Sequence, residues 1–167
     1  MTPGSVYLVV VATESKNKKG QEPVWYTKGL RFECQPDCAN CCVNHGDYAY
    51  VYLEKTDARR LARHLRLKMA EFKERYTEAE DEYLILRMDQ PACPFLEGRR
   101  CTVYPARPTQ CRTFPFWESN LSSRSAWKRL RVFCPDIDQG ELHPLRVIES
   151  HLADQDSRSA STGRRAR

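Results

Sequence analysis

The sequence predicts a small, irregular, metal-nucleated α+β domain, in which short strands, a hairpin and several short helices surround a cysteine cluster. Three observations favour this class. The chain has 167 residues, the size of one domain. Its segments with helical or alternating apolar periodicity are short and of both kinds. Eight cysteines, four of them within nine consecutive positions, offer the metal chemistry that can hold such short elements together.

The chain is expected to divide into three parts. Residues 1–23 form an N-terminal extension, in which the apolar run 6–12 (VYLVVVA) predicts a strand and 16–22 (KNKKGQE) predicts a loop. Residues 24–154 form the cysteine-cluster domain. Residues 155–167 are polar and carry four arginines, so we expect a disordered basic tail.

The first helical pattern lies between residues 57 and 76. Thr56 is a candidate N-cap, and Asp57 is favourable in the first helical turn. Apolar residues recur there at three- and four-residue spacing, which predicts a helix with one apolar face. They are Leu61, Ala62, Leu65, Met69, Phe72 and Tyr76. Periodicity alone leaves open whether this stretch is one helix or two.

A strand and a hairpin are expected next. Tyr83 to Met88 (YLILRM) is short, apolar and partly β-branched, which favours a buried strand. In CPFLEGRRCTVY, two apolar runs flank Glu97-Gly98-Arg99, where glycine can adopt a positive φ, so this stretch predicts a hairpin. Prolines then predict turns around a short helical segment near Cys111.

Two further helices complete the predicted domain. Ser122 or Ser123 is a candidate cap for a helix that includes Trp127 and Leu130 and ends before Cys134. The last helix is expected from Pro144 to Ala153. Trp117 and Trp127 are interpreted as core residues. His64 lies between charged neighbours and is expected at the surface.

The candidate metal ligands are the eight cysteines. They are Cys34, Cys38, Cys41, Cys42, Cys93, Cys101, Cys111 and Cys134. Packing alone does not explain four thiols within nine residues, whereas an isolated cysteine is often a small buried hydrophobe. His45 follows the first group but is more simply an exposed loop histidine, so it is not counted as a ligand.

The spacing of these cysteines predicts that several sulfurs converge. Residues 34–41 have the form C-x3-C-x2-C, and Pro36-Asp37 favours a tight turn within it. Cys93 and Cys101 are expected on opposite arms of the hairpin, where diagonal partners lie within about 7–8 Å. Adjacent side chains in an extended segment point to opposite sides, so Cys41 and Cys42 are expected to serve different ions. This favours two four-cysteine sites over one.

Disulfides, zinc and an iron–sulfur cluster are the three chemistries that such a pattern allows. No positive charge precedes the apolar run 6–12, so it does not resemble a signal peptide, and we expect a cytoplasmic protein with reduced thiols. Zinc sites usually repeat C-x2-C, which occurs here once. Three cysteines along one loop with a distant fourth favour an iron–sulfur cluster, of the 4Fe–4S type. C-x3-C-x2-C is also the spacing of radical S-adenosylmethionine enzymes, but this chain is too short for their fold.

Charge and hydropathy argue against two other classes. The formal charge of +5 falls to +1 without residues 158–167, because 23 Lys and Arg then face 22 Asp and Glu. The folded part is therefore not expected to bind nucleic acid. The seven apolar residues 6–12 are too few to span a membrane.

Three motifs together resemble a known family. FECQPDCANCC, CPFLEGRRCTVYPARPTQCRTFPFW and the segment ending in CPDIDQG are similar to the YkgJ-like cysteine-cluster (CxxCxxCC) family of zinc- or iron-chelating, or Fe–S-cluster, proteins. The resemblance covers residues 24–150 and all eight cysteines, and it includes the RP..CR signature at residues 107–112. The usual opening is C-x2-C-x2-C-C, whereas the first gap here holds three residues. The resemblance also implies a break between two helices near Leu67.

These observations support competing functions. The first is an iron–sulfur protein that serves in electron transfer or as an accessory to another enzyme. The second is a protein with structural zinc whose surface binds a protein partner. A related cysteine cluster in flagellin lysine-N-methylases makes an accessory role in protein methylation a further alternative. The sequence shows no nucleophile–base pair, so whether it is an enzyme stays open. Arg107 and Arg112 are interpreted as salt-bridge partners rather than anion ligands.

Overall fold

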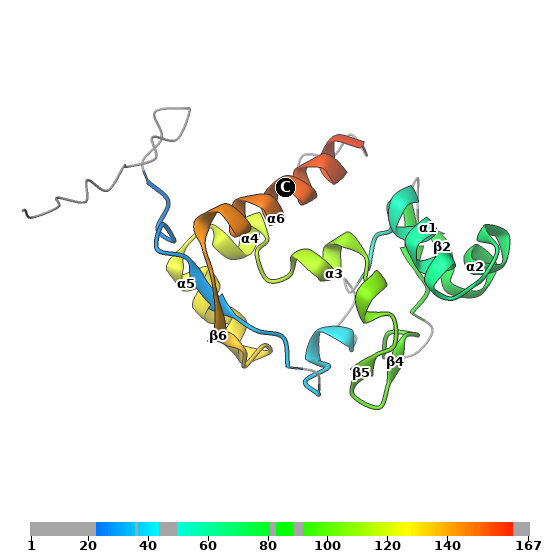
Figure 1. Cartoon of the computed structure of the whole chain (residues 1–167), viewed down its shortest axis with the longest axis horizontal. Helices are drawn as coiled ribbons and strands as arrows, with labels where there is room; N and C mark the ends of the chain where they lie inside the picture. Colours follow the sequence, from blue (N-terminus) through cyan, green and yellow to red (C-terminus); the bar gives the residue numbers. More distant parts are fainter. Residues whose placement is uncertain (1–22, 36, 44–49, 81–82, 89–91, 162–167) are drawn as a thin grey trace, which may run out of the picture.

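The computed structural model of the chain describes residues 23–161, apart from residue 36 and the segments 44–49, 81–82 and 89–91. Side chains are described as far as residue 156. The predicted strand at residues 6–12 and His45 lie outside the described residues. Figure 1 shows two halves with the short helix α3 (Thr109–Thr113) between them. The 3₁₀ helix η1 (Asn40–Cys42) also lies where the halves meet.

The first half is built from the two ends of the described chain. Strand β1 (Leu30–Phe32) pairs antiparallel with β6 (Ile137–His143), with Leu30 opposite His143 and Phe32 opposite Ile137. Around this pair lie α4 (Glu118–Leu121), α5 (Arg124–Arg129), η3 (Leu130–Val132) and α6 (Leu145–Ser161). Its buried core consists of Tyr26, Leu30, Phe32, Phe116, Leu121, Trp127, Cys134, Ile137 and Ile148.

The second half contains the middle of the chain. Helices α1 (Lys55–His64) and α2 (Met69–Tyr76) precede the hairpin of β2 (Thr77–Glu80) and β3 (Tyr83–Leu86). The smaller hairpin of β4 (Leu96–Glu97) and β5 (Arg100–Cys101) and the 3₁₀ helix η2 (Tyr104–Ala106) follow. Its buried core consists of Leu53, Ala58, Leu61, Ala62, Phe72, Leu86, Phe95, Val103 and Ala106.

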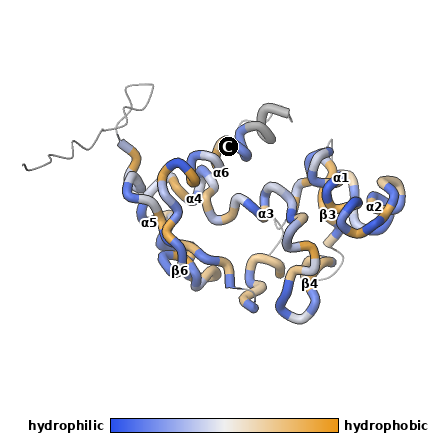
Figure 2. Tube along the Cα trace, viewed as in Figure 1, coloured by the Kyte–Doolittle hydropathy of each residue, from blue (hydrophilic) through white to orange (hydrophobic). Residues whose placement is uncertain are grey.

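The two halves therefore have separate cores inside one α+β domain. Figure 2 shows hydrophobic residues in both halves as short stretches between hydrophilic ones. Each core is small, so burial of apolar surface supplies limited stability to either half. Attachment of the halves to one another therefore depends on the polar contacts and the cysteines at their junction.

Close approach of the backbones explains a glycine beside β1. Gly29 has a φ of +83°, a left-handed conformation that favours glycine. A Cβ atom at this position would lie 2.5 Å from the carbonyl oxygen of His143 on β6. The pairing of β1 with β6 therefore leaves no room for a side chain at position 29.

The helices confirm the break near Leu67 and correct the predicted cap. α1 ends at His64 and α2 begins at Met69, with Arg66 between them at a φ of 58°. The N-cap of α1 is Glu54 rather than Thr56. Glu54 and Asp57 form a reciprocal capping box, which satisfies two backbone donors at once and so outcompetes a single threonine hydroxyl.

The other predicted elements are present, with some boundary corrections. Strand β3, the hairpin turn with Gly98 at a φ of 59°, and the Ser123 cap of α5 are confirmed. Cys93 is not on a hairpin arm, since Leu96 faces Cys101 and Cys93 precedes β4. The last helix runs to Ser161 rather than Ala153, so part of the expected tail is helical. No proline or glycine interrupts residues 145–161, and Gln155 donates to the hydroxyl of Thr113 at 2.9 Å.

Candidate metal centre

The first four cysteines lie on an irregular loop that follows β1. A turn in which the Cys38 amide donates to the Gln35 carbonyl at 3.1 Å reverses the chain. Ala39 adopts a left-handed φ of 58° and leads into η1, where the Cys42 amide donates to the Ala39 carbonyl. Cys41 is exposed, whereas the other three cysteines of the loop are partly buried.

The second half holds this loop through the β4–β5 hairpin. Arg99, in the turn between the two strands, donates to the carbonyl oxygens of Asp37 and, at 2.7 Å, of Cys38. Arg100 forms an ion pair with Asp37 at 3.1 Å. The amide of Cys93 donates to the carbonyl of Cys42 at 2.7 Å. These contacts place the segments that carry Cys93 and Cys101 against the loop.

The first half holds the opposite side of the loop. The Asn40 side chain donates to the Phe133 carbonyl at 2.8 Å, and the Gln35 amide donates to the Asp136 carboxylate at 3.3 Å. Phe133 and Asp136 flank the buried Cys134. The loop is therefore hydrogen-bonded to the first half through Gln35 and Asn40, and to the second half through the backbone of Cys38 and Cys42.

The remaining cysteine, Cys111, lies on helix α3, which two neighbouring residues, Thr109 and Gln110, attach to the second half. The amide and hydroxyl of Thr109 donate to the fully buried carboxylate of Asp57 on α1 at 3.0 and 2.9 Å. Gln110 accepts from the Tyr52 amide at 3.1 Å and donates to the Tyr50 carbonyl at 2.9 Å. Neither Asp57 nor Gln110 was singled out as a site residue from the sequence, although the capping-box spacing of Asp57 is a recognisable signal.

The charge of Cys41 influences most of the other thiols. Burial is the largest cause of the raised pKa values of Cys34, Cys93, Cys101, Cys111 and Cys134, and the charge of Cys41 raises each of them further. For Cys42, the hydrogen bond with Cys41 is the largest cause of the raised pKa, followed by burial. Six cysteines from four segments thus lie within electrostatic reach of one thiol.

Arg107 supplies positive charge to this group. Burial raises the pKa of Cys34, Cys101 and Cys111, and Arg107 opposes that rise in all three. Its guanidinium lies 3.6 Å from the centre of the Tyr104 ring and donates to the Tyr104 carbonyl. Arg112 donates to the Thr109 hydroxyl. The expected salt bridges are wrong, since neither arginine pairs with a carboxylate among the described residues, and each instead contacts a neutral group.

The adjacent pair differs from the predicted geometry. Cys41 and Cys42 lie in the 3₁₀ helix η1, not in an extended segment, and their sulfurs are 4.0 Å apart. Tetrahedral coordination with Zn–S bonds of about 2.3 Å separates two sulfurs by about 3.8 Å. The expected extended geometry is therefore wrong, and the assignment of these two thiols to different ions stays a prediction.

The donor set fits zinc or iron–sulfur chemistry, because both use cysteine thiolates. All eight cysteines are among the described residues, and none is in a disulfide. Within that part of the chain, no three Cys, His, Asp or Glu side chains form a ready enclosure for one ion. His64 is exposed and lies 3.4 Å from the Thr102 carbonyl. The structure brings the cysteine-bearing segments together, but it does not arrange their thiols around a single ion position among the described residues.

Metal binding to these thiols should release protons. Burial raises the pKa of Cys93 and Cys134 to about 11 and that of Cys111 to about 12, so all three are protonated at pH 7. Each must lose its proton to bind a metal, and affinity should therefore fall as the pH falls. Calorimetric titration with Zn²⁺ in buffers of different ionisation enthalpy measures the release. We expect about one proton per ligating thiol, and a Cys93→Ser variant should release about one fewer. Release of less than one proton per bound ion would contradict thiol coordination.

The fold and the thiols define a cysteine-rich metal-chelating domain. Residues 33–135 match the model of the CxxCxxCC family, described as a "putative zinc- or iron-chelating domain". This match covers more than half of the chain and contains all eight cysteines. The chain belongs to this family. No solved structure matches the chain. Among the described residues, no helix combines the length and apolar character needed to cross a membrane.

Proposed function

We propose that the chain holds an iron–sulfur cluster of the 4Fe–4S type through its cysteine thiolates, and serves in electron transfer or as an accessory to another enzyme. The main support is that hydrogen bonds attach the loop of residues 34–42 both to the segments that carry Cys93 and Cys101 and to the residues that flank Cys134. Cysteines distant in the sequence are thereby held near the loop. A bound cluster would supply one-electron chemistry. A cytoplasmic location would keep the eight thiols reduced.

Two features of the residues favour a cluster over a single ion. Cys34, Cys38 and Cys41 occupy one loop, and a fourth thiol comes from a distant segment, which is the usual arrangement for cluster ligands. Arg107 places positive charge near Cys34, Cys101 and Cys111, which would offset the negative charge of thiolates and cluster. Partial burial of these three thiols would also limit access of water to the cluster.

The two cores support a division of the thiols into two sites. Cys34 and Cys134 pack with the core of the first half, whereas Cys93 and Cys101 pack against the core of the second. We therefore assign one site to three cysteines of the loop together with Cys134, and the other to Cys42, whose carbonyl accepts from the Cys93 amide, together with the three cysteines of the middle of the chain. The first set is Cys34, Cys38, Cys41 and Cys134. The second set is Cys42, Cys93, Cys101 and Cys111.

Metal and sulfide analysis with a visible spectrum, on protein purified without oxygen, tests the iron–sulfur proposal. We expect iron and acid-labile sulfide in equal amounts, about four of each for one cluster and about eight for two, with a broad absorption band at about 400 nm. Iron without sulfide, or a colourless protein with bound zinc, would overturn the cluster.

Structural zinc is the second candidate. It is favoured by the 4.0 Å separation of the Cys41 and Cys42 sulfurs, which is close to the spacing around one tetrahedral ion. In that case the metal would organise the fold, and the surface would carry the function by binding a partner. About one or two zinc ions per chain would support this candidate.

A further inference from the structure

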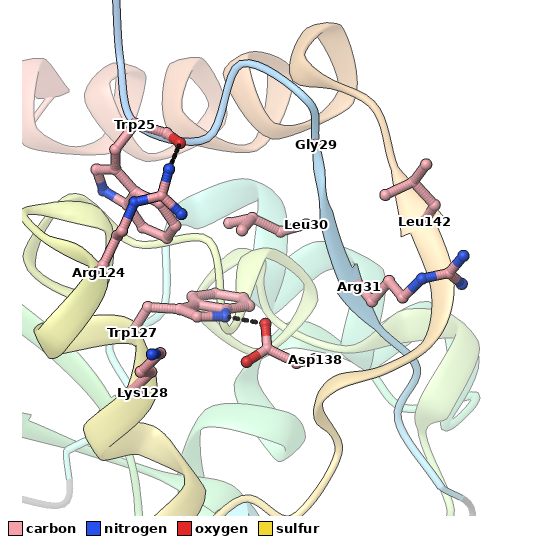
Figure 3. Close-up of a pocket in the computed structure, with 9 residues that line it drawn as sticks. All are labelled: Trp25, Gly29, Leu30, Arg31, Arg124, Trp127, Lys128, Asp138 and Leu142. Atoms are coloured by element: carbon pink, nitrogen blue, oxygen red, sulfur yellow. Dashed lines mark hydrogen bonds between the residues drawn. The ribbon is translucent and has the colours of Figure 1, made fainter.

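A pocket of about 370 Å³ lies in the first half of the molecule, and no cysteine lines it. Its walls come from the turn before β1, from β1 itself, from α5 and from β6 (Figure 3). Ligand pockets in proteins have volumes of about 300–1,000 Å³, so this one can hold a large side chain or a small molecule. The lining residues are Trp25, Gly29, Leu30, Arg31, Arg124, Trp127, Lys128, Asp138 and Leu142.

The interior of the pocket is aromatic and apolar. Figure 3 shows Trp25, Leu30 and Trp127 on one side, with Leu142 on β6 opposite them. Trp25 donates its indole N–H to the Leu121 carbonyl at 2.7 Å, and Trp127 donates to the Asp138 carboxylate at 2.7 Å. Both indole donors are thus used inside the protein. Trp25 is partly buried and offers ring surface to a ligand, whereas Trp127, 2% exposed, forms the floor of the pocket.

The charged residues that line the pocket are mainly positive. Arg31, Arg124 and Lys128 are exposed, and Asp138 is the one carboxylate among the lining residues. Asp138 is already engaged by Arg131 at 2.6 Å as well as by Trp127.

The three cations are bound only weakly, or not at all, by the rest of the protein. Arg31 and Arg124 donate to the backbone carbonyls of Gly140 and Trp25, and the Arg124 guanidinium also lies 5.2 Å from the centre of the Trp25 ring. Neither arginine pairs with a carboxylate among the described residues. In the same part of the chain, no hydrogen bond or ion pair involves the ammonium of Lys128, which is therefore available to a ligand.

We propose that this pocket binds an acidic peptide segment of a protein partner, which places one large apolar side chain against Trp25 and Leu142 and its carboxylates against Arg31, Arg124 and Lys128. Charge complementarity selects the acidic partner. A peptide is favoured over a small anion because the pocket wall includes an exposed apolar side chain, Leu142, which is 47% exposed. Tryptophan and arginine are also the residues that most often dominate protein–protein binding energy.

The test uses the metal-loaded full chain and NMR signals of its indole N–H groups. The probe is the capped peptide Glu-Glu-Phe-Glu-Glu, with Glu-Glu-Gly-Glu-Glu and Lys-Lys-Phe-Lys-Lys as controls. We expect saturable shifts of the Trp25 and Trp127 signals with the first peptide, and much weaker shifts with the controls. Trp117, which does not line the pocket, is the internal reference. Shifts of all three signals alike, or equal binding of the three peptides, would overturn the proposal.

Matched charge reversals on one helix separate local recognition from net charge. Lys128→Glu should weaken binding of Glu-Glu-Phe-Glu-Glu by about fivefold or more, whereas Arg129→Glu, an exposed neighbour outside the pocket, should change it less than twofold. Equal losses in both variants would overturn the proposal. So would full displacement of the peptide by equimolar phenylacetate, which would identify a small-molecule site. Neither variant should change the metal content, so this test is independent of the proposed metal function.

Discussion

Cys111→Ser and Cys134→Ser, made separately, are each expected to remove about half of the bound metal, and the double variant is expected to remove all of it and unfold the protein. The reason lies in the assignment of Cys134 to one set of four thiols and of Cys111 to the other. Each half has only a small core of its own. Binding of structural metal supplies about 10–16 kcal/mol in zinc-finger peptides, which is as large as the whole net stability of a typical domain, about 5–15 kcal/mol.

Metal content by mass spectrometry and circular dichroism measure the two effects. Glu74→Gln, at an exposed position on α2, is the matched control and should keep full metal and full helicity. If either single cysteine variant lost all of its metal, the thiols would belong to one shared site centred on Cys41. Full metal retention by the double variant would contradict the role of both cysteines.

Asp57→Asn is expected to cost about 3 kcal/mol of unfolding free energy and to weaken metal binding at the site that contains Cys111. The Asp57 carboxylate is fully buried and accepts hydrogen bonds from two groups of Thr109. It also accepts from Arg60 at 2.5 Å and from the Glu54 amide at 3.3 Å. An asparagine has one acceptor oxygen, so its NH₂ group would face a donor, and the partly exposed Arg60 would lose its ion pair.

Arg60 connects the Asp57 carboxylate to the segment that leads into α3. It donates to the Ala106 carbonyl and, at 2.7 Å, to the Arg107 carbonyl, just before Cys111. Urea unfolding of the metal-loaded protein measures the stability. The control is Glu71→Gln, which breaks a solvent-exposed i,i+4 ion pair with Arg75 and should cost less than about 0.5 kcal/mol. Equal costs for the two substitutions would contradict the structural role of Asp57.

Local elements of the fold could be predicted from the sequence because local signals determine them. Ser123 caps α5, glycine at position 98 permits the hairpin turn, and apolar spacing gives α1 and α2. The pairing of β1 with β6 joins segments more than 100 residues apart, and β1 has only three residues. So short a strand carries no recognisable alternation, and nothing local specifies its partner.

The candidate ligands could be predicted from the sequence, but the residues that hold the cysteine-bearing segments in place could not. Cysteine spacing is a sequence property, so the ligand candidates and the family followed from it. Asp57 and Arg99 look in the sequence like charges on a solvated surface. Their roles appear only once the chain is folded, because Asp57 contacts Thr109 and Arg99 contacts the carbonyl of Cys38. The geometry of Cys41 and Cys42 was likewise set by the 3₁₀ turn after Ala39.

X-ray absorption at the edge of the bound metal tests the central claim most directly, namely that the cysteine thiols at the junction of the two halves hold the metal. We predict a first coordination shell of about four sulfur atoms per metal, whether the metal is zinc or iron. Cys111→Ser and Cys134→Ser should lower the amount of this sulfur-ligated metal. A first shell dominated by nitrogen or oxygen would contradict the account, because the metal would then be bound outside the thiol cluster.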